Sequence, residues 1–185
     1  MDDSYIEKVL KGDSSSFNYI IKTYKRYAYS ISYAILKDKH LTEDAVQESF
    51  VNAYKGLKSF KKNSQFQTWL GKIVINESLK RVKLKVSEKT FLSEISEEEI
   101  EFVNDSIDSL LKYDQRRLIS IVFEQLPPNE SLALELFYLK ENSLDEVTEI
   151  TGWSRSKTKM LLLRGRKSFY FRLKRILKSE IKEIL

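Results

Sequence analysis

The sequence contains no cysteine, a single histidine, two prolines and five glycines. Without cysteine the chain can form neither disulfides nor thiolate metal sites, and nothing calls for an oxidising compartment. His40 has no second histidine or cysteine with which to share a metal, so we interpret it as a surface residue. So few helix-breaking residues, together with abundant Leu, Ile, Lys and Glu, predict an all-α protein.

Long apolar runs and catalytic signatures are missing as well. No apolar stretch approaches the roughly 20 residues that span a bilayer, and the charged first residues argue against a signal peptide. We therefore expect a cytoplasmic chain with no membrane insertion. The sequence has no phosphate-cradling glycine loop, no paired metal motif and no Ser/His arrangement. We therefore predict that the protein is not an enzyme and has no catalytic residues, cofactor or metal.

Charge divides the chain into three parts. Residues 1–87 carry 16 basic and 9 acidic side chains, residues 88–114 carry 2 and 9, and residues 115–185 carry 14 and 9. The apolar periodicity also breaks down in the acidic part, so we predict two small helical domains joined by an acidic linker at 88–114. Basic domains favour polyanionic partners, although a net charge of +5 is weak support alone. The glutamates could instead hold a metal, but partner histidines are missing.

Four helices are predicted in the first domain from apolar residues at three- and four-residue steps. A short helix over residues 4–11 ends at Gly12, and a long one runs from Phe17 to about Lys37. The third helix is expected to be capped by Thr42 and the fourth by Ser64. The start of the fourth helix is apolar almost all round, so we expect it to be buried.

One edge of this fourth helix combines an aromatic ring, an amide and cations. Trp69, Lys72, Asn76, Lys80 and Lys83 follow one another at steps of three and four, which places them on one line. Rings stack on bases, amides read base edges and cations neutralise the backbone, so the line is a workable surface for single-stranded nucleic acid. Alternatively, the aromatic residues belong to the core and the lysines form an ordinary solvated face.

The second domain has the signals of a helix-turn-helix. A helix must end before the double proline, and a second helix is expected over residues 130–140. A capping box then starts a short helix at 144–150, a glycine allows a tight turn, and a basic helix follows, whose N-terminus would enter the major groove. The capping and turn residues are, in order, Asn129, Ser143 with Glu146, Gly152 and Ser154.

The residues at 44–50 (DAVQESF), Phe60, 64–73 (SQFQTWLGKI) and Asn76 resemble region two of bacterial sigma factors. The closest group is the extracytoplasmic-function (ECF) class of the sigma-70 family. The second domain resembles region four of that family at 126–128 (LPP), Leu136 and 144–154 (LDEVTEITGWS), followed by Lys159, Leu162, Arg164, Arg166 and Lys167. The resemblance implies domain boundaries at 1–87 for region two and 115–185 for region four.

The resemblance implies a transcription initiation factor that binds the beta and beta-prime subunits of core RNA polymerase, directs the enzyme to promoter DNA and assists melting. The predicted polymerase-binding residues are Asp44, Gln47, Glu48 and Asn52. The predicted minus-ten residues are Phe60, Lys61, Lys62, Asn63, Ser64, Phe66, Trp69, Lys72, Asn76 and Lys80. Those predicted for the minus-thirty-five element are Ser154, Arg155, Ser156, Lys157 and Lys159, with Arg164, Arg166 and Lys167 holding phosphates.

Four residues depart from the family pattern. Lys157 stands where threonine is usual, Thr158 where valine is, and Leu161 and Ile75 where arginine is frequent. Base preference therefore cannot be copied from relatives. The family also commonly has an anti-sigma factor as partner, which no residue here demonstrates. The alternative function is a helix-turn-helix activator with an N-terminal regulatory domain, which would bind DNA without polymerase.

Overall fold

A computed structural model describes residues 2–61, 64–89 and 107–184, without the side chains of residues 85–89, 107–114 and 178–184. Within these ranges the chain consists of helices and turns with no strand, which confirms the all-α prediction. None of the helices in these ranges has the length and apolar character needed to cross a bilayer. Lys62 and Asn63, predicted to bind the minus-ten element, and the middle of the predicted linker lie outside the described residues.

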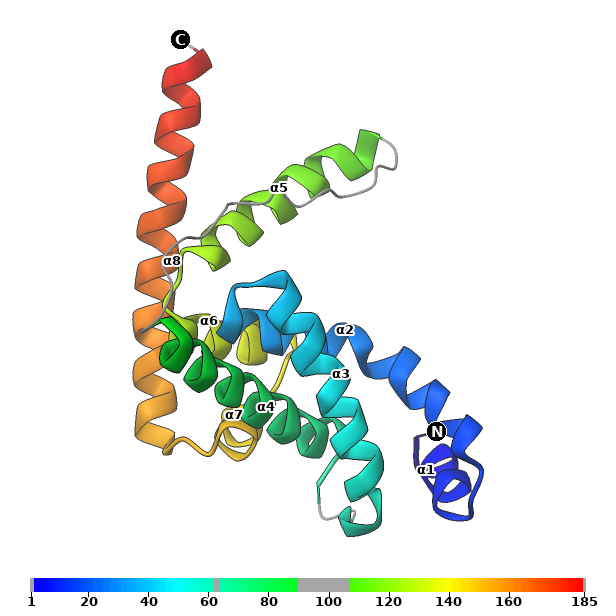
Figure 1. Cartoon of the computed structure of the whole chain (residues 1–185). Coiled ribbons are helices and arrows are strands. Elements are labelled where there is room, and N and C mark those ends of the chain that lie inside the picture. The colour runs from blue at the N-terminus through cyan, green and yellow to red at the C-terminus, as the bar shows by residue number, and fades with distance from the viewer. Residues whose placement is uncertain (1, 62–63, 90–106, 185) are drawn as a thin grey trace.

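The described helices fall into an N-terminal half, α1 to α4, and a C-terminal half, α5 to α8 (Figure 1). The N-terminal half holds α1 (Asp2–Leu10), α2 (Phe17–Leu36), α3 (Lys39–Gly56) and α4 (Phe66–Lys89), with short 3-10 turns at Ser14–Ser16 and Leu57–Ser59. The C-terminal half holds α5 (Ile107–Glu124), α6 (Pro128–Leu134), a π-helical turn at Glu135–Leu139, α7 (Leu144–Thr151) and α8 (Arg155–Ile184).

Two predicted helix starts are wrong. Thr42 does not cap α3, because Asp38 takes extended backbone angles and its carboxylate accepts a hydrogen bond from the Leu41 amide at 3.1 Å. Thr42 lies inside the helix and is buried. Asn129 does not cap α6 either, since Pro127 precedes the helix and Pro128 is its first residue, where a missing amide proton costs nothing. The fourth helix begins at Phe66, just beyond the expected cap Ser64.

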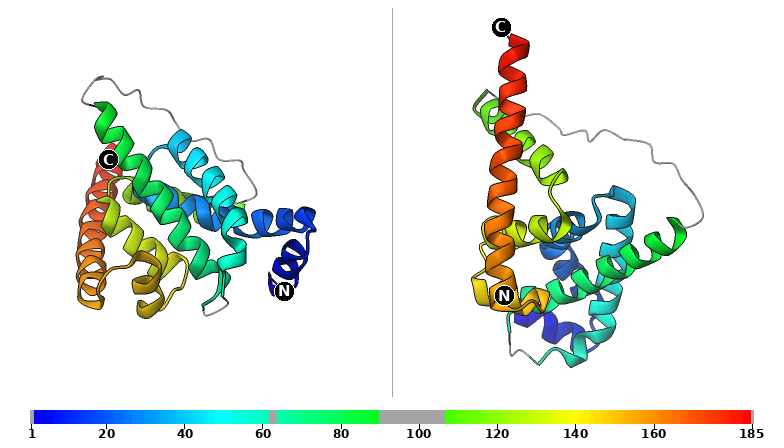
Figure 2. Two further views of the ribbon diagram at one scale, coloured as in Figure 1. Left: turned by 60° about the horizontal axis from the view of Figure 1, so that its bottom comes forward. Right: turned by 90° about the vertical axis from the view of Figure 1, so that its left-hand side faces the viewer.

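The first hydrophobic core lies where α2, α3 and α4 pack together. Figure 2 shows the arrangement of these helices in two views. α4 contributes Phe66, Leu70, Val74 and Ile75, all at most 5% exposed, which confirms that its first half is buried. Ile20, Ala28 and Ile31 of α2 are fully enclosed against it. The amphipathic stripes of three helices therefore form one bundle.

The C-terminal half has a smaller core of its own between α6 and α8. It is built from Leu126, Ala133, Leu134, Leu161 and Leu162. Gly165 lets the two helices approach closely, because a Cβ atom there would lie 3.0 Å from Leu134 Cγ and 3.3 Å from the Glu130 carbonyl oxygen. α8 then continues far beyond this contact to the C-terminus (Figure 1).

The first core does not stop at the N-terminal half. Leu132 and Leu136, and Val147 and Ile150 of α7, belong to the same buried cluster as α2 and α4. α6 packs on α2 while α7 packs on α4. The two predicted domains are therefore in direct contact, and their boundaries at 1–87 and 115–185 remain a prediction.

Candidate nucleic-acid and polymerase surfaces

Three aromatic rings form a compact group at the start of α4. The ring centroids lie 5.5 Å apart for Phe60 and Phe66, 5.3 Å for Phe60 and Trp69, and 5.5 Å for Phe66 and Trp69. Phe66 is buried, whereas Phe60 and Trp69 are half-buried. Phe66 is thus a core residue, in line with the alternative that the aromatic residues belong to the core. It supports two rings that solvent can reach.

The polar residues predicted along α4 differ in how far they are exposed. Asn76 and Lys80 are exposed, and Lys80 Nζ lies 3.8 Å from Glu77 Oε2. Lys72 is half-buried, because its Nζ reaches across to Glu149 Oε1 of α7 at 3.0 Å. Before the helix, Lys61 is exposed and Ser64 half-buried. The structure therefore brings the described minus-ten candidates together around one end and one side of α4.

The predicted polymerase-binding residues lie along α3. Asp44 and Gln47 are exposed, and Asp44 Oδ2 lies 3.5 Å from Arg81 Nη1. Glu48 and Asn52 are half-buried, and Asn52 donates a hydrogen bond to Glu77 Oε1 at 3.0 Å. This side of α3 thus presents carboxylates and an amide that α4 partly supports.

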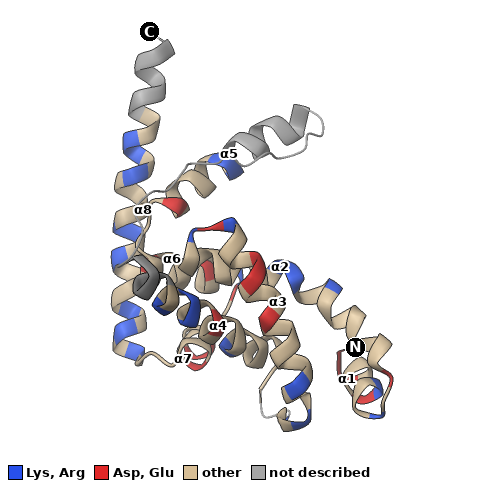
Figure 3. Ribbon diagram, viewed as in Figure 1, with Lys and Arg blue, Asp and Glu red and all other residues tan. Residues whose placement is uncertain are grey.

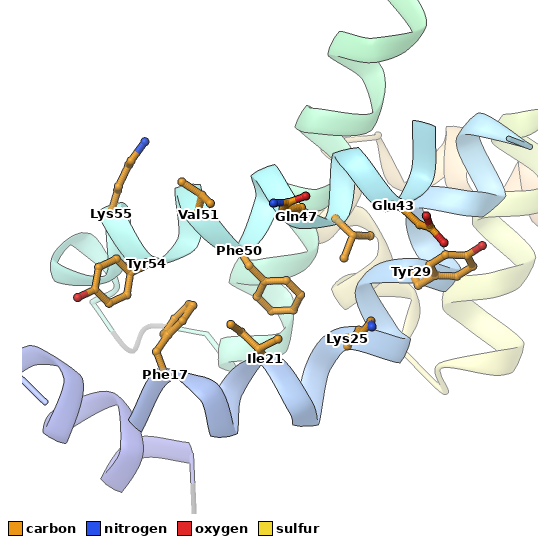
Figure 4. A pocket seen from close by; sticks show the side chains of 11 residues that line it. Phe17, Ile21, Lys25, Tyr29, Glu43, Gln47, Phe50, Val51, Tyr54 and Lys55 are labelled. Atoms are coloured by element: carbon orange, nitrogen blue, oxygen red, sulfur yellow. The ribbon is translucent and has the colours of Figure 1, made fainter. Parts of the chain in front are cut away.

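A groove of about 810 Å³ lies between α2 and α3, next to these residues (Figure 4). Phe17 and Ile21 of α2 face Phe50 of α3 across it, and charged or amide side chains surround the apolar part. The sequence analysis missed this groove. Tyr54 of α3 lines this groove and is 45% exposed. The sequence signal that could have found the groove is the pair Val51 and Tyr54, two apolar residues three positions apart on α3. Val51 is 38% exposed. The remaining lining residues are Lys25, Tyr29, Glu43, Val46, Gln47 and Lys55.

The helix-turn-helix is built as predicted from local capping signals. The Ser143 hydroxyl accepts a hydrogen bond from the Glu146 amide at 3.2 Å, and the Glu146 carboxylate accepts one from the Ser143 amide at 2.8 Å. Gly152 ends α7 in the left-handed conformation at φ 69°. Ser154 then caps α8, because its hydroxyl accepts from the Lys157 amide at 3.2 Å.

All eight predicted minus-thirty-five residues are exposed on the first turns of α8 and just before it. Arg155 contacts the Asp145 carboxylate of α7, and Lys157 Nζ lies 5.3 Å from the centre of the Trp153 ring. Arg166 donates a hydrogen bond to Tyr138 Oη at 3.4 Å. Lys and Arg recur along α8 (Figure 3). The residues concerned are Ser154, Arg155, Ser156, Lys157, Lys159, Arg164, Arg166 and Lys167.

Three of the four departures from the family pattern are core positions. Thr158 is fully buried and donates its hydroxyl proton to the Ser154 carbonyl oxygen at 3.1 Å. Leu161 and Ile75 are 6% and 4% exposed and pack in the second and first cores. Lys157 is the one departure on the exposed surface. Of the four, it alone changes the chemistry that a DNA partner would meet.

Comparison with known proteins shows the family of this chain. The family Sigma-70 region 2 matches residues 20–86, which include most of α2, all of α3 and almost all of α4. The ECF RNA polymerase sigma factor SigW of Bacillus subtilis is 30% identical over 171 residues, which cover 88% of this chain and 91% of SigW. The chain belongs to the ECF class of the sigma-70 family.

One further relative supports this identification, and one solved structure shares the fold. The ECF sigma factor SigM of Bacillus subtilis is 30% identical over 149 residues, covering 80% of this chain and 88% of SigM. The sigma factor RpoE of Bartonella quintana, solved in complex with the anti-sigma factor NepR, shares the fold with a TM-score of 0.65. It is 17% identical, and the match covers 85% of this chain and 96% of RpoE. This ECF sigma factor is therefore a transcription initiation factor, as predicted, and the activator alternative is not favoured.

Proposed function

We propose that this sigma factor binds core RNA polymerase through α3, captures an unpaired base of the minus-ten element at the start of α4, and reads the minus-thirty-five element with the first turns of α8. It acts in the cytoplasm and has no catalytic step of its own. One observation carries the proposal. The same chain, a member of this family, has an edge of aromatic and cationic residues on α4 and a capped helix-turn-helix formed by α7 and α8.

The α3 surface has the composition of a protein interface. An apolar groove lies beside the carboxylates of Asp44 and Glu48, and interfaces combine an apolar centre with a polar rim. The carboxylates suit a basic partner, for which we propose the coiled coil of the beta-prime subunit. Arg81 already holds Asp44 in place from α4.

The rings at the start of α4 suit an extruded base. Phe60 and Trp69 are half-buried, and buried Phe66 holds both from below, so their positions are set before DNA binds. Stacking on such rings stabilises an unpaired base by about 1–3 kcal/mol, which is similar to the cost of removing it from the duplex. Lys61 and Lys80 add positive charge beside them. Melting would then begin where this group offers a place for the base.

An anti-sigma factor is proposed as a further partner, because the neighbouring RpoE structure contains the anti-sigma factor NepR. Such a partner would compete with polymerase for the groove between α2 and α3.

The deciding experiment is reconstituted run-off transcription with core polymerase on genomic DNA, with start sites mapped. It is combined with co-purification of the double charge reversal Asp44→Lys and Glu48→Lys. We expect at least a tenfold loss of core binding with unchanged helicity, because like charges would then face a basic partner. Glu141→Lys, an exposed acid in the C-terminal half, is the matched control and should bind normally. Normal co-purification of the double variant would contradict the proposed interface.

A further inference from the structure

One half-buried lysine connects the two halves of the chain. Lys37 ends α2 in the left-handed conformation at φ 51°, which is uncommon for a residue other than glycine. Its Nζ donates one hydrogen bond to the Phe123 carbonyl oxygen and another to Ser131 Oγ, both at 2.7 Å. The ammonium group therefore sits at the corner between α5 and α6, far along the sequence from its own helix.

Several groups around Lys37 partly offset the cost of burying its positive charge. Phe123 belongs to the last turn of α5, where the helix dipole favours a cation. The carboxylates of Glu124 and Glu135 both act on the lysine charge, and Glu124 also accepts a hydrogen bond from Tyr33 Oη of α2 at 3.3 Å. Glu135 is buried and paired with Lys140 at 3.2 Å. The corner is thus a polar contact inside a largely apolar interface.

A second contact closes the other end of the interface. Gly71 of α4 lies so near α7 that a Cβ atom there would be 3.0 Å from Ile150 Cγ2. Lys72 and Glu149 form the ion pair at 3.0 Å beside it. Both are more than a third exposed, so this pair stabilises the contact only weakly. The hydrogen bonds of Lys37 and the apolar packing therefore do most to fix how the two halves of the chain fit together.

This closed arrangement is too short to read both promoter elements. Lys72 contacts Glu149 of α7, and Arg155 contacts Asp145 of the same eight-residue helix. With an α7 length of about 12 Å plus side-chain reach, the two proposed DNA sites lie within roughly 30 Å. Elements about 25 base pairs apart are separated by roughly 85 Å of duplex, at 3.4 Å per base pair. The halves must therefore separate before both elements are bound.

We propose that Lys37 is a latch that holds the C-terminal half against α2 in the free sigma factor and is released when core polymerase binds. The latch itself stands on the contacts above, whereas the need for its release rests on the proposed function. Lys37 is a positioning residue and touches no DNA in this scheme. Losing its charge-assisted hydrogen bonds should shift the balance between closed and open chains by about tenfold or more toward open.

The test uses distances within the full chain, which has no natural cysteine to interfere with labelling. Spin labels at Thr23→Cys on α2 and Asn129→Cys on α6, both exposed, report the separation of the halves by pulsed electron paramagnetic resonance. The intact chain should give one narrow, short distance. Lys37→Glu, which places a carboxylate beside Glu124 and Glu135, should give a broad, longer distribution, and Lys37→Met a mixture of both. Lys39→Met, an exposed lysine in the same turn, should match the intact chain.

The outcomes separate the latch from the function. Short distances in both Lys37 variants, or a broad distribution in the intact chain, would overturn the latch without involving DNA or polymerase. Should circular dichroism show that Lys37→Glu has lost helix, Lys37→Met decides, because its apolar stem preserves the packing. Adding core polymerase to the intact chain should lengthen the distance. Bound chains that keep the short distance would overturn the release step alone.

Discussion

Replacing Gly71 with alanine tests how closely the two halves of the chain pack. The added Cβ would lie 2.8 Å from Tyr27 Oη of α2 and 3.0 Å from Ile150 Cγ2 of α7, and both of these residues are buried. Overpacking of this kind costs about 1–3 kcal/mol. Alanine also favours the helix over glycine by about 1 kcal/mol, which offsets part of that cost. We expect a net loss of about 1 kcal/mol, or roughly 2–4 °C in Tm for a chain of this size.

The measurement is urea unfolding followed by circular dichroism, with Gly56→Ala as the control. At Gly56 the nearest atom to an added Cβ is Trp69 Cζ2 at 3.6 Å, an ordinary contact, so the same change should be neutral or slightly stabilising. Adding Tyr27→Phe to Gly71→Ala removes the closest atom and should recover part of the loss. If Gly71→Ala stabilised the chain as much as the control does, the close approach of α4, α2 and α7 would be refuted.

Three further predictions concern stability and promoter choice. Burial lowers the pKa of Lys37 from 10.5 to about 8, so between those pH values the folded chain holds fewer protons than the unfolded chain. The free energy of unfolding should therefore rise from pH 8 to 9.5, and Lys37→Met should flatten that slope in urea titrations. Ser143→Ala should cost about 1 kcal/mol by removing the cap of α7, measured the same way. Arg155→Ala and Lys157→Ala should change which upstream sequences are transcribed from a promoter library, whereas Lys167→Ala should weaken all promoters alike; a uniform loss for all three would remove the base-reading assignment.

Local signals predicted the helices well where a single side chain decides the boundary. Phe17 starts α2 as expected, and Ser143 with Glu146 starts α7 through the predicted capping box. The start of α3 was missed because Asp38 and Thr42 are both good caps four residues apart, and the sequence does not show that Thr42 is needed inside the core. Capping strength alone could not choose between them.

The structure shows which candidate residues are exposed, whereas their binding roles stay predictions. Asn76 and Lys157 are exposed, as the proposed contacts require, but Tyr54 lines a groove that the sequence pattern does not indicate. Periodicity assigns a residue to a helix face without showing whether a neighbouring helix covers that face. Lys37 shows this limit most clearly. A lysine at a helix end usually lies in solvent, whereas the Lys37 ammonium group forms hydrogen bonds inside an interface.

The all-round apolar start of α4 explains why the halves come together. A helix that is apolar on every side needs partners on more than one face. α2 and α3 cover part of α4, and Val147 and Ile150 of α7 extend the same core over it. Separating the halves would return this apolar surface to water, at about 25 cal/mol for each Å² exposed. A partner that binds the open form must offset that cost, so in the intact chain, with Lys37 in place, the open form should accumulate only when core polymerase is present.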